Sequence, residues 1–246
     1  MTGFPSRAAS GLGLDPGSVH VWSVRLDPPP EVVERLGRSL SADEWERARR
    51  FRFERHQRQY VVGRGALRAL LAAYLGTLPE LIRFTYGPRG KPFLAPPLDA
   101  GGLFFNLSNS DELALVGLVH GVEIGVDVEY LKRMPDCEVI AERFFSESER
   151  KVLRELPAAR KEEAFFNCWT RKEAYLKAVG EGLAAPLDSF DVTLAPGEAP
   201  RMLTLKGNAE RASRWFFRHL LPAPDYVGAV AIEGGDWAVE TWSFTG

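Results

Sequence analysis

The chain has 246 residues, of which 45% are hydrophobic and 26% charged, and these proportions are ordinary for a soluble globular protein. Its formal net charge of -2 argues against a general nucleic-acid binder, which would be strongly basic. Its two cysteines, Cys137 and Cys168, give neither a disulfide framework nor a metal-binding spacing, and no stretch approaches the roughly 20 apolar residues of a membrane span. We therefore expect a cytoplasmic protein that begins with a loose, Gly-, Ser- and Pro-rich segment, residues 1–17.

The first half of the chain predicts strands and helices in alternation. Apolar runs and alternating patterns predict strands at residues 19–26, 81–86, 103–107 and 113–119. Helices are predicted at 30–40, from the capping box at 41–44 onward, and at 56–75, where Gly76 ends the last of them.

The second half repeats this mixture. A strand at 122–128 follows the previous one after His120-Gly121, which is a hairpin signal. Helices are predicted from Asp136 to residue 144, from the capping box at 146–149 to residue 156, and over 158–179. Further strands are predicted at 190–194, 202–205, 215–220, 226–232 and 237–242.

Three carboxylates stand out within these elements. Asp127 and Glu129 alternate with apolar residues, so both point to one face of their strand. In the helix over 158–179, Glu173 and Lys177 lie four residues apart on one stripe. Oxygen ligands of this kind suit Mg²⁺, and the lysine could meet a phosphate as a point charge. A solvated strand face and a plain Glu173–Lys177 helix pair are the simpler alternatives.

Two basic features accompany the carboxylates. Arginines crowd residues 47–58, which predicts a solvated helix face, an anion site for a cofactor with several phosphates, or a surface that faces an acidic partner. Residues 87–92 read Gly-Pro-Arg-Gly-Lys-Pro, a turn whose glycines allow close backbone approach and whose Lys91 could meet a phosphate; a plain hairpin turn is the alternative.

Taken together and in order, these motifs resemble the 4'-phosphopantetheinyl transferases, specifically the large surfactin-type branch. The resemblance rests on residues 125–129 (GVDVE), 143–147 (RFFSE), 169–177 (WTRKEAYLK), 180–183 (GEGL) and 186–190 (PLDSF). Weaker matches lie at 90–92 (GKP) and 105–108 (FNLS), so the similarity extends over most of residues 41–192.

The resemblance implies an α+β fold of two pseudo-symmetric lobes, each a small mixed or antiparallel sheet packed with helices, with the active site at their interface. We place the lobes at residues 18–120 and 121–246. Because two lobes in one chain can complete the site, we expect a monomer.

The resemblance also implies the reaction. Coenzyme A would donate its phosphopantetheine arm to a serine of an apo acyl or peptidyl carrier protein, and 3',5'-ADP would leave. By similarity, the site residues then take three roles. Metal ligands would be Asp127, Glu129 and Glu173; catalytic groups would be Glu173, Lys177 and Lys172; coenzyme A contacts would be Arg47, Arg58, Lys91, Ser108, Asn109 and Lys177.

Asn109 departs from the family, which usually has histidine there; asparagine can donate a hydrogen bond but carries no charge. A surface for the acidic carrier protein is expected near Arg143, Phe144 and Phe145, although core packing is an equal alternative for both phenylalanines. The chain has no local signature of an internal nucleophile, which fits a nucleophile carried by another protein. A magnesium-dependent hydrolase and a silent relative that binds coenzyme A or a carrier protein are the rival interpretations. Oxygen ligands of this kind suit Mn²⁺ as well as Mg²⁺.

Overall fold

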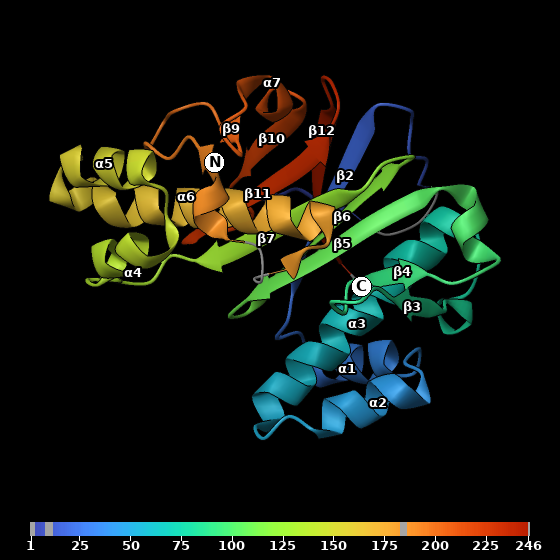
Figure 1. The fold of residues 1–246 in the computed structure, drawn as a ribbon. Helices are drawn as coiled ribbons and strands as arrows, with labels where there is room; N and C mark the ends of the chain where they lie inside the picture. The colour runs from blue at the N-terminus through green and yellow to red at the C-terminus, as the bar shows by residue number, and fades with distance from the viewer. Residues whose placement is uncertain (1–2, 8–11, 183–185, 246) are drawn as a thin grey trace.

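Two β-sheets packed face to face form the centre of the protein, seen here in a computed structural model that describes residues 3–7, 12–182 and 186–245 (Figure 1). The larger sheet has the order β1 (Ser6–Arg7), β12 (Ala238–Phe244), β2 (Ser18–Arg25), β6 (Leu113–His120) and β5 (Leu103–Ser110). The smaller has the order β10 (Trp215–Leu220), β11 (Tyr226–Glu233) and β7 (Ile124–Tyr130). Two hairpins stand apart, β3 (Phe84–Tyr86) with β4 (Pro92–Leu94) and β8 (Phe190–Val192) with β9 (Met202–Leu205).

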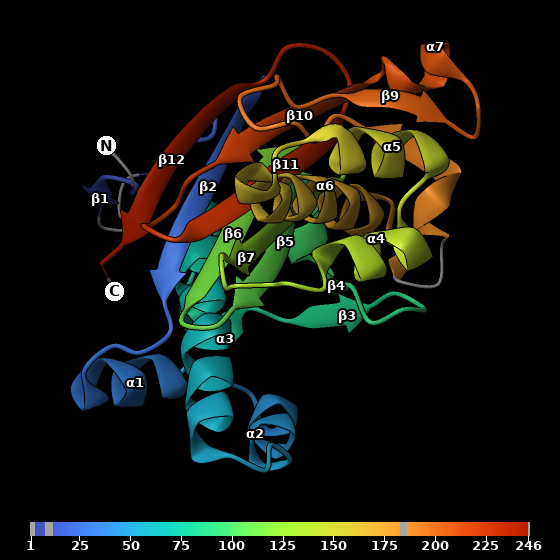
Figure 2. The same cartoon turned by 90° about the vertical axis from the view of Figure 1, so that its left-hand side faces the viewer.

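Helices cover both outer faces of this pair of sheets (Figures 1 and 2). On the side of the larger sheet lie α1 (Pro30–Gly37), α2 (Ala42–Arg49) and the long α3 (Glu54–Leu75). On the side of the smaller sheet lie α4 (Cys137–Phe144), α5 (Glu147–Glu155), the long α6 (Ala158–Val179) and the short α7 (Ala209–Ala212). The expected α+β class is confirmed.

The alternation of apolar residues along the strands explains this layering. In β7, Ile124, Val126 and Val128 are buried between the two sheets, whereas the residues between them face α6. In β6, Leu113 and Leu115 face the same inter-sheet core, and Ala114 and Val116 pack toward α3. Each sheet is therefore apolar on both faces, as a sheet buried between two layers requires.

One topological expectation needs correction. Strands β6 and β7 are not a hairpin: β6 pairs with β2 and β5, and β7 pairs with β11. The His120-Gly121 turn instead carries the chain from one sheet into the other, which a local turn pattern cannot distinguish from a hairpin. The larger sheet also takes in β12 from the C-terminal end of the chain, which lies between β1 and β2.

The ends of predicted segments differ as well. Within the segment expected to be loose, β1 pairs in parallel with β12. Residues 1–2 and 8–11 of that segment, and residue 183 of the predicted 180–183 motif, lie outside the described residues.

A buried ion pair in each half shows that the two halves are built alike. The capping-box residue Glu44 of α2 accepts hydrogen bonds from Arg64 Nε (2.5 Å) and Arg68 Nε (2.8 Å) on α3. The capping-box residue Glu149 of α5 lies 2.8 Å from Lys172 Nζ on α6. Arg68 and Lys172 each also donate to two backbone carbonyls of the segment after their own helix. The expected pseudo-symmetry is thus visible in buried contacts, although the amino-acid sequence shows no internal repeat.

Gly125 lets α6 lie unusually close to β7. A Cβ atom at this position would stand 1.9 Å from the carbonyl oxygen of Ala174 and 2.4 Å from the amide nitrogen of Ala178. Both contacts are to helix backbone, which cannot swing aside as the end of a flexible side chain could. The first residue of the GVDVE motif therefore fixes the distance between the strand that carries Asp127 and the helix that carries Glu173.

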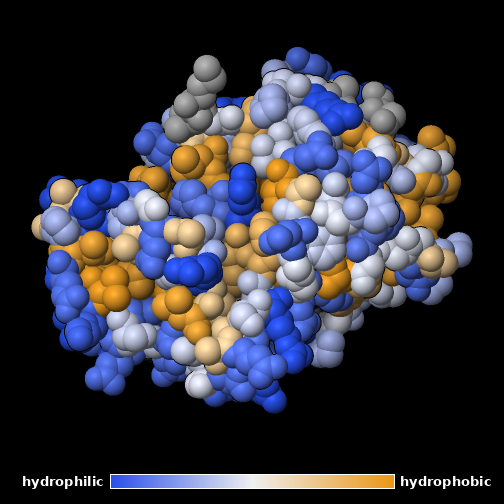
Figure 3. All heavy atoms as spheres, turned by 90° about the horizontal axis from the view of Figure 1, so that it is seen from above, coloured by the Kyte–Doolittle hydropathy of each residue, from blue (hydrophilic) through white to orange (hydrophobic). Residues whose placement is uncertain are grey.

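No helix in the described part of the chain is long and apolar enough to cross a membrane. On the face shown in Figure 3, hydrophilic and hydrophobic residues are interspersed in small groups.

We expect Gly125→Ala to destabilise the protein by more than about 3 kcal/mol, because overpacking against backbone forces the helix away from the sheet. Gly235→Ala is the matched control, since a Cβ atom there would meet no atom within 4 Å. Chemical denaturation measures both. A Gly125→Ala protein as stable as the Gly235→Ala protein would contradict the close helix–strand contact.

Candidate functional site

The three predicted carboxylates and Lys177 meet where β7, α6 and the edge strand β5 come together. Ser108 Oγ of β5 donates to Asp127 Oδ1 (2.8 Å), and Ser110 Oγ donates to Glu129 Oε2 (2.7 Å). Lys177 Nζ of α6 lies 2.6 Å from Asp127 Oδ1 and 2.6 Å from Ser108 Oγ. The alternative of a Lys177–Glu173 helix pair is not what the structure shows: the lysine pairs with the strand carboxylate.

Side chains rather than a backbone ladder join β5 to β7. Asn106 Oδ1 accepts from the Val126 amide (2.9 Å), and Ser110 Oγ accepts from the Tyr130 amide (3.2 Å). Asn106, Ser108 and Ser110 are alternate residues, so a strand places all three on one face. We call these three residues the polar seam. The polar seam holds the edges of the two sheets together and orients both carboxylates of β7.

Hydrogen bonds and the nearby positive charge do not fully offset the burial of these carboxylates. Burial, followed by the nearby Asp127 charge, raises the pKa of Glu173 from 4.5 to about 7. Burial also raises the pKa of Glu129. Asp127 Oδ2 and Glu173 Oε1 are buried oxygens that have no hydrogen-bond partner among the described residues. Oxygens left in this state are suited to a divalent cation.

As they stand, the carboxylates do not yet form a ligand set. Within residues 3–7, 12–182 and 186–245, no three His, Cys, Asp or Glu side chains are grouped so that they could hold a metal ion. The oxygen chemistry fits a hard cation, but Lys177 occupies the Oδ1 atom of Asp127.

A groove leads from this cluster to the arginine-rich region. One cleft is lined by Asn109, Ser110, Glu129, Tyr130 and Lys132 together with residues of α3. A second cleft is lined by the arginines Arg47, Arg50 and Arg89, and also by Asp43 and Glu46. Both clefts share Phe51 and Tyr60, so they adjoin. Of the expected coenzyme A contacts, Arg47 and Asn109 line these clefts, whereas Ser108 and Lys177 contact each other in the carboxylate cluster.

Arg58 and Lys91 lie elsewhere. Arg58 donates to the carbonyl oxygen of Pro28 and lies 3.4 Å from Asp27, so it contacts the loop before α1. Lys91 Nζ bonds Glu123 (2.6 Å) and the carbonyl oxygen of Ala178 (3.0 Å), and burial lowers its pKa. Lys91 thus ties the β3–β4 hairpin to the other half of the protein, and its ammonium group is engaged by protein atoms.

The expected catalytic assistance from Lys172 needs correction. Its side chain is 0% exposed, and its ammonium contacts Glu149 (2.8 Å) and the carbonyl oxygens of Leu187 (2.7 Å) and Phe190 (2.5 Å). A group enclosed in this way cannot touch a substrate. It points about 100° around the α6 axis from Glu173, as adjacent residues of a helix do.

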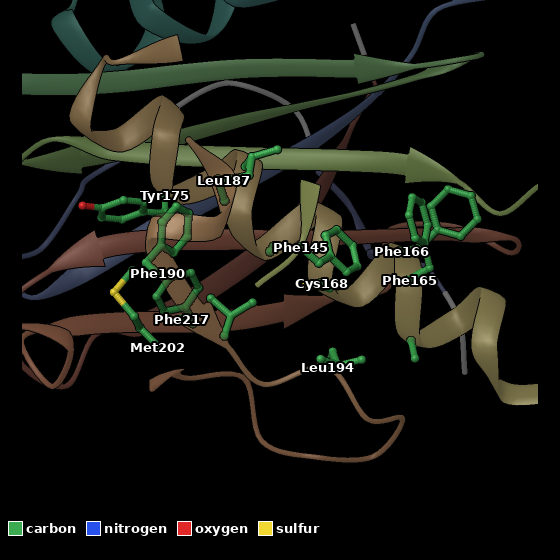
Figure 4. Close-up of a cluster of buried hydrophobic side chains, with 14 of the residues drawn as sticks. Phe145, Phe165, Phe166, Cys168, Tyr175, Leu187, Phe190, Leu194, Met202 and Phe217 are labelled. Carbon is green, nitrogen blue, oxygen red and sulfur yellow. The ribbon is translucent and has the colours of Figure 1, made fainter. Parts of the chain in front are cut away.

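The aromatic residues near α4 are mostly core. Phe145 is 2% exposed and stacks on Phe165 at 5.2 Å, within the hydrophobic cluster around α6 (Figure 4). Phe144 packs edge-on against Trp169, and both are partly buried. Only Arg143 of the expected carrier-binding trio is exposed, so the core alternative holds for Phe145.

Several groove residues were not singled out from the sequence. Arg50 and Arg89 lie within the two basic segments but had no pattern that separated them from their neighbours. Tyr60 and Lys132 reach the groove only through the tertiary arrangement of α3 and the segment after β7.

We expect Glu173→Gln to stabilise the metal-free protein above neutral pH. The folded state keeps a proton on Glu173 that the unfolded state releases, so the free energy of unfolding falls as pH rises from 4.5 to about 7. Glutamine removes this slope, and at pH 8 in chelator the Tm should be about 2–4 °C higher than in the wild type.

Glu163→Gln, on the exposed part of α6, is the matched control and should keep the wild-type pH profile. Thermal unfolding between pH 4 and 8 provides the measurement. Identical profiles for Glu173→Gln and the wild type would show that the folded protein does not raise the pKa of Glu173.

Comparison with known proteins assigns the family. A family model described as "4'-phosphopantetheinyl transferase superfamily" matches residues 123–231, and one described as "4'-phosphopantetheinyl transferase, N-terminal" matches residues 25–119. The chain is 41% identical to the 4'-phosphopantetheinyl transferase HetI of Nostoc sp. over 95% of both chains. It is 34% identical to the transferase psf-1 of Bacillus pumilus, covering 72% of this chain and 76% of that protein. It is 30% identical to Sfp of Bacillus subtilis, covering 72% and 77%. The chain belongs to the 4'-phosphopantetheinyl transferase family, in its Sfp-like branch, and the expected enzyme class is confirmed.

Proposed function

We propose that the protein transfers the 4'-phosphopantetheine group of coenzyme A to a serine of an apo carrier protein, with a divalent cation, Mg²⁺ or Mn²⁺, at the carboxylates. The observation that carries the proposal is the pair of buried, unpartnered oxygens, Asp127 Oδ2 and Glu173 Oε1. They belong to the same acidic cluster as Glu129, which lines a cleft that adjoins one lined with arginines. Together the two clefts take residues from both halves of one chain, which supports a monomer.

Asp127, Glu129 and Glu173 would hold the cation. When bound, it would neutralise negative charge on the pyrophosphate of coenzyme A and on the leaving 3',5'-ADP. The polar seam keeps Asp127 and Glu129 oriented, and the α6–β7 contact keeps Glu173 opposite them.

Two residues of α6, Glu173 and Lys177, would act on the serine proton and on the transferred phosphate. As the serine oxygen bonds to phosphorus and the bond to 3',5'-ADP breaks, Glu173 is placed to accept the serine proton, directly or through water. Lys177 would stabilise the negative charge on the transferred phosphate, one helical turn from Glu173.

The anionic nucleotide end of coenzyme A would lie along the basic cleft. Arg47, Arg50 and Arg89 converge there from α2, the residue that follows it and the β3–β4 turn, and guanidinium groups bind phosphate well. Tyr60 and Tyr86 line the same cleft.

We expect purified apo carrier protein to gain the mass of one phosphopantetheine group after incubation with this protein, coenzyme A and Mg²⁺. Asp127→Asn and Glu173→Gln should lower kcat by about 10²–10³, because each removes a charged oxygen from the transition-state environment. Asp111→Asn, in the same cleft but paired with Arg55, is the control and should keep nearly wild-type turnover.

Intact-mass spectrometry gives the readout, with chelator as a further control. Coenzyme A consumption without carrier modification would favour the hydrolase instead. Binding of coenzyme A with neither reaction, across fatty-acid, polyketide and peptide carriers, would favour a silent relative.

Arg50→Ala and Arg89→Ala should each raise the KM for coenzyme A about 10- to 100-fold, the range of a lost charge-assisted hydrogen bond, with little change in kcat. Arg49→Ala provides the matched control, because Arg49 lies over the Trp45 ring and does not line the cleft. Steady-state kinetics with coenzyme A as the varied substrate tests this. Equal KM values for all three variants and the wild type would place the nucleotide end elsewhere.

A further inference from the structure

Lys177 is held in the position of a counter-ion. Its ammonium lies 2.6 Å from Asp127 Oδ1, and Asp127 is only 3% exposed. Ser108 Oγ lies within hydrogen-bond distance of both groups, at 2.6 Å from Lys177 Nζ and 2.8 Å from Asp127 Oδ1. The lysine is thus fixed by two contacts from two different strands, β5 and β7, rather than by its own helix.

Lys177 therefore neutralises the charge of Asp127, one of the carboxylates proposed to bind the metal ion. Of the oxygens at the centre of the cluster, Asp127 Oδ1 is bonded by Lys177 and Ser108, whereas Asp127 Oδ2 and Glu173 Oε1 have no partner within the described ranges. A divalent cation at the free Oδ2 atom of Asp127 would lie close to the ammonium group on Oδ1, and two positive charges at such short range in a buried site repel each other. Binding of a divalent cation therefore favours release of the ammonium group from Asp127.

We propose that Lys177 is an internal stand-in for the metal ion, and that its release from Asp127 couples the binding of the divalent cation to the binding of coenzyme A. This inference rests on the proposed function. Without coenzyme A, the lysine neutralises Asp127 and competes with the cation. With coenzyme A bound, the pyrophosphate gives the ammonium a second anionic partner, and Asp127 is free to bind the cation.

The physical basis is the cost of leaving a charge unpaired. Breaking a half-buried ion pair leaves Lys177 without a partner unless another anion is present. Coenzyme A removes this cost, so each ligand strengthens the binding of the other by the same factor. The Ser108 hydroxyl sits between the two positions and can keep one hydrogen bond to Asp127 when the lysine leaves.

The test measures Mn²⁺ affinity by electron paramagnetic resonance and calorimetry, with and without coenzyme A and without any carrier protein. In the wild type, coenzyme A should tighten Mn²⁺ binding by about tenfold, within the usual range of such coupling. Lys177→Met should bind Mn²⁺ about tenfold more tightly than the wild type when coenzyme A is absent, and coenzyme A should tighten its Mn²⁺ binding by a smaller factor than in the wild type. Lys177→Gln gives a second uncharged variant for the same comparison.

Lys132→Met is the matched control. Lys132 is exposed and lines the same cleft near Glu129, so its removal deletes a nearby positive charge without breaking the Asp127 ion pair. The control should keep the wild-type coupling between Mn²⁺ and coenzyme A.

Four results would overturn the inference. One is an unchanged or weaker Mn²⁺ affinity in both Lys177 variants, and another is an equal gain in affinity in Lys132→Met. Failure of every variant to bind Mn²⁺ even with coenzyme A would overturn the proposed metal site as well. Normal carrier modification by the wild type, together with wild-type coupling in the Lys177 variants, would reject this inference alone and leave the proposed function standing.

Discussion

The close approach of α6 to β7 is the constraint on which the rest of the site depends. Because residue 125 has no side chain, the backbone of Ala174 and Ala178 can lie against the strand, and Glu173 faces the carboxylates of β7. The apolar residues of β7 face the opposite way, into the core between the sheets. One strand therefore serves both the inter-sheet core and the acidic cluster, and a shift of the helix would disturb both.

The polar seam solves a second problem, which is how to join two sheets at their edges. Where β5 meets β7, Asn106 and Ser110 satisfy backbone amides of β7 that have no ladder partner on that side. The serines of the same face also bond Asp127 and Glu129. The contacts that hold the two halves together are thus the contacts that position the carboxylates. Because the same contacts do both jobs, Glu129 and Glu173 stay in a fixed arrangement although burial raises their pKa values. Their burial lowers the stability of the folded protein.

Much of this could be predicted from the sequence, because local patterns carry it. Period-two alternation placed Asp127 and Glu129 on one strand face, and helical spacing placed Glu173 and Lys177 on one stripe. Capping boxes marked the starts of α2 and α5. The features that local patterns did not predict depend on residues distant in sequence. They are the partner of β6, the position of β12, the enclosure of Lys172 and the loop contacts of Arg58. Lys177 shows the same limit, since helical spacing suggested Glu173 as its partner and the fold supplied Asp127.

The most direct test of the account is a crystal structure of the protein with coenzyme A and Mn²⁺, using anomalous scattering to locate the metal. The account predicts an anomalous peak bound by Asp127, Glu129 and Glu173, with Lys177 Nζ moved from Asp127 to a phosphate of coenzyme A. It also predicts that the nucleotide end lies against Arg47, Arg50 and Arg89. A metal bound away from these carboxylates, or coenzyme A bound with the Lys177–Asp127 pair still intact, would contradict it.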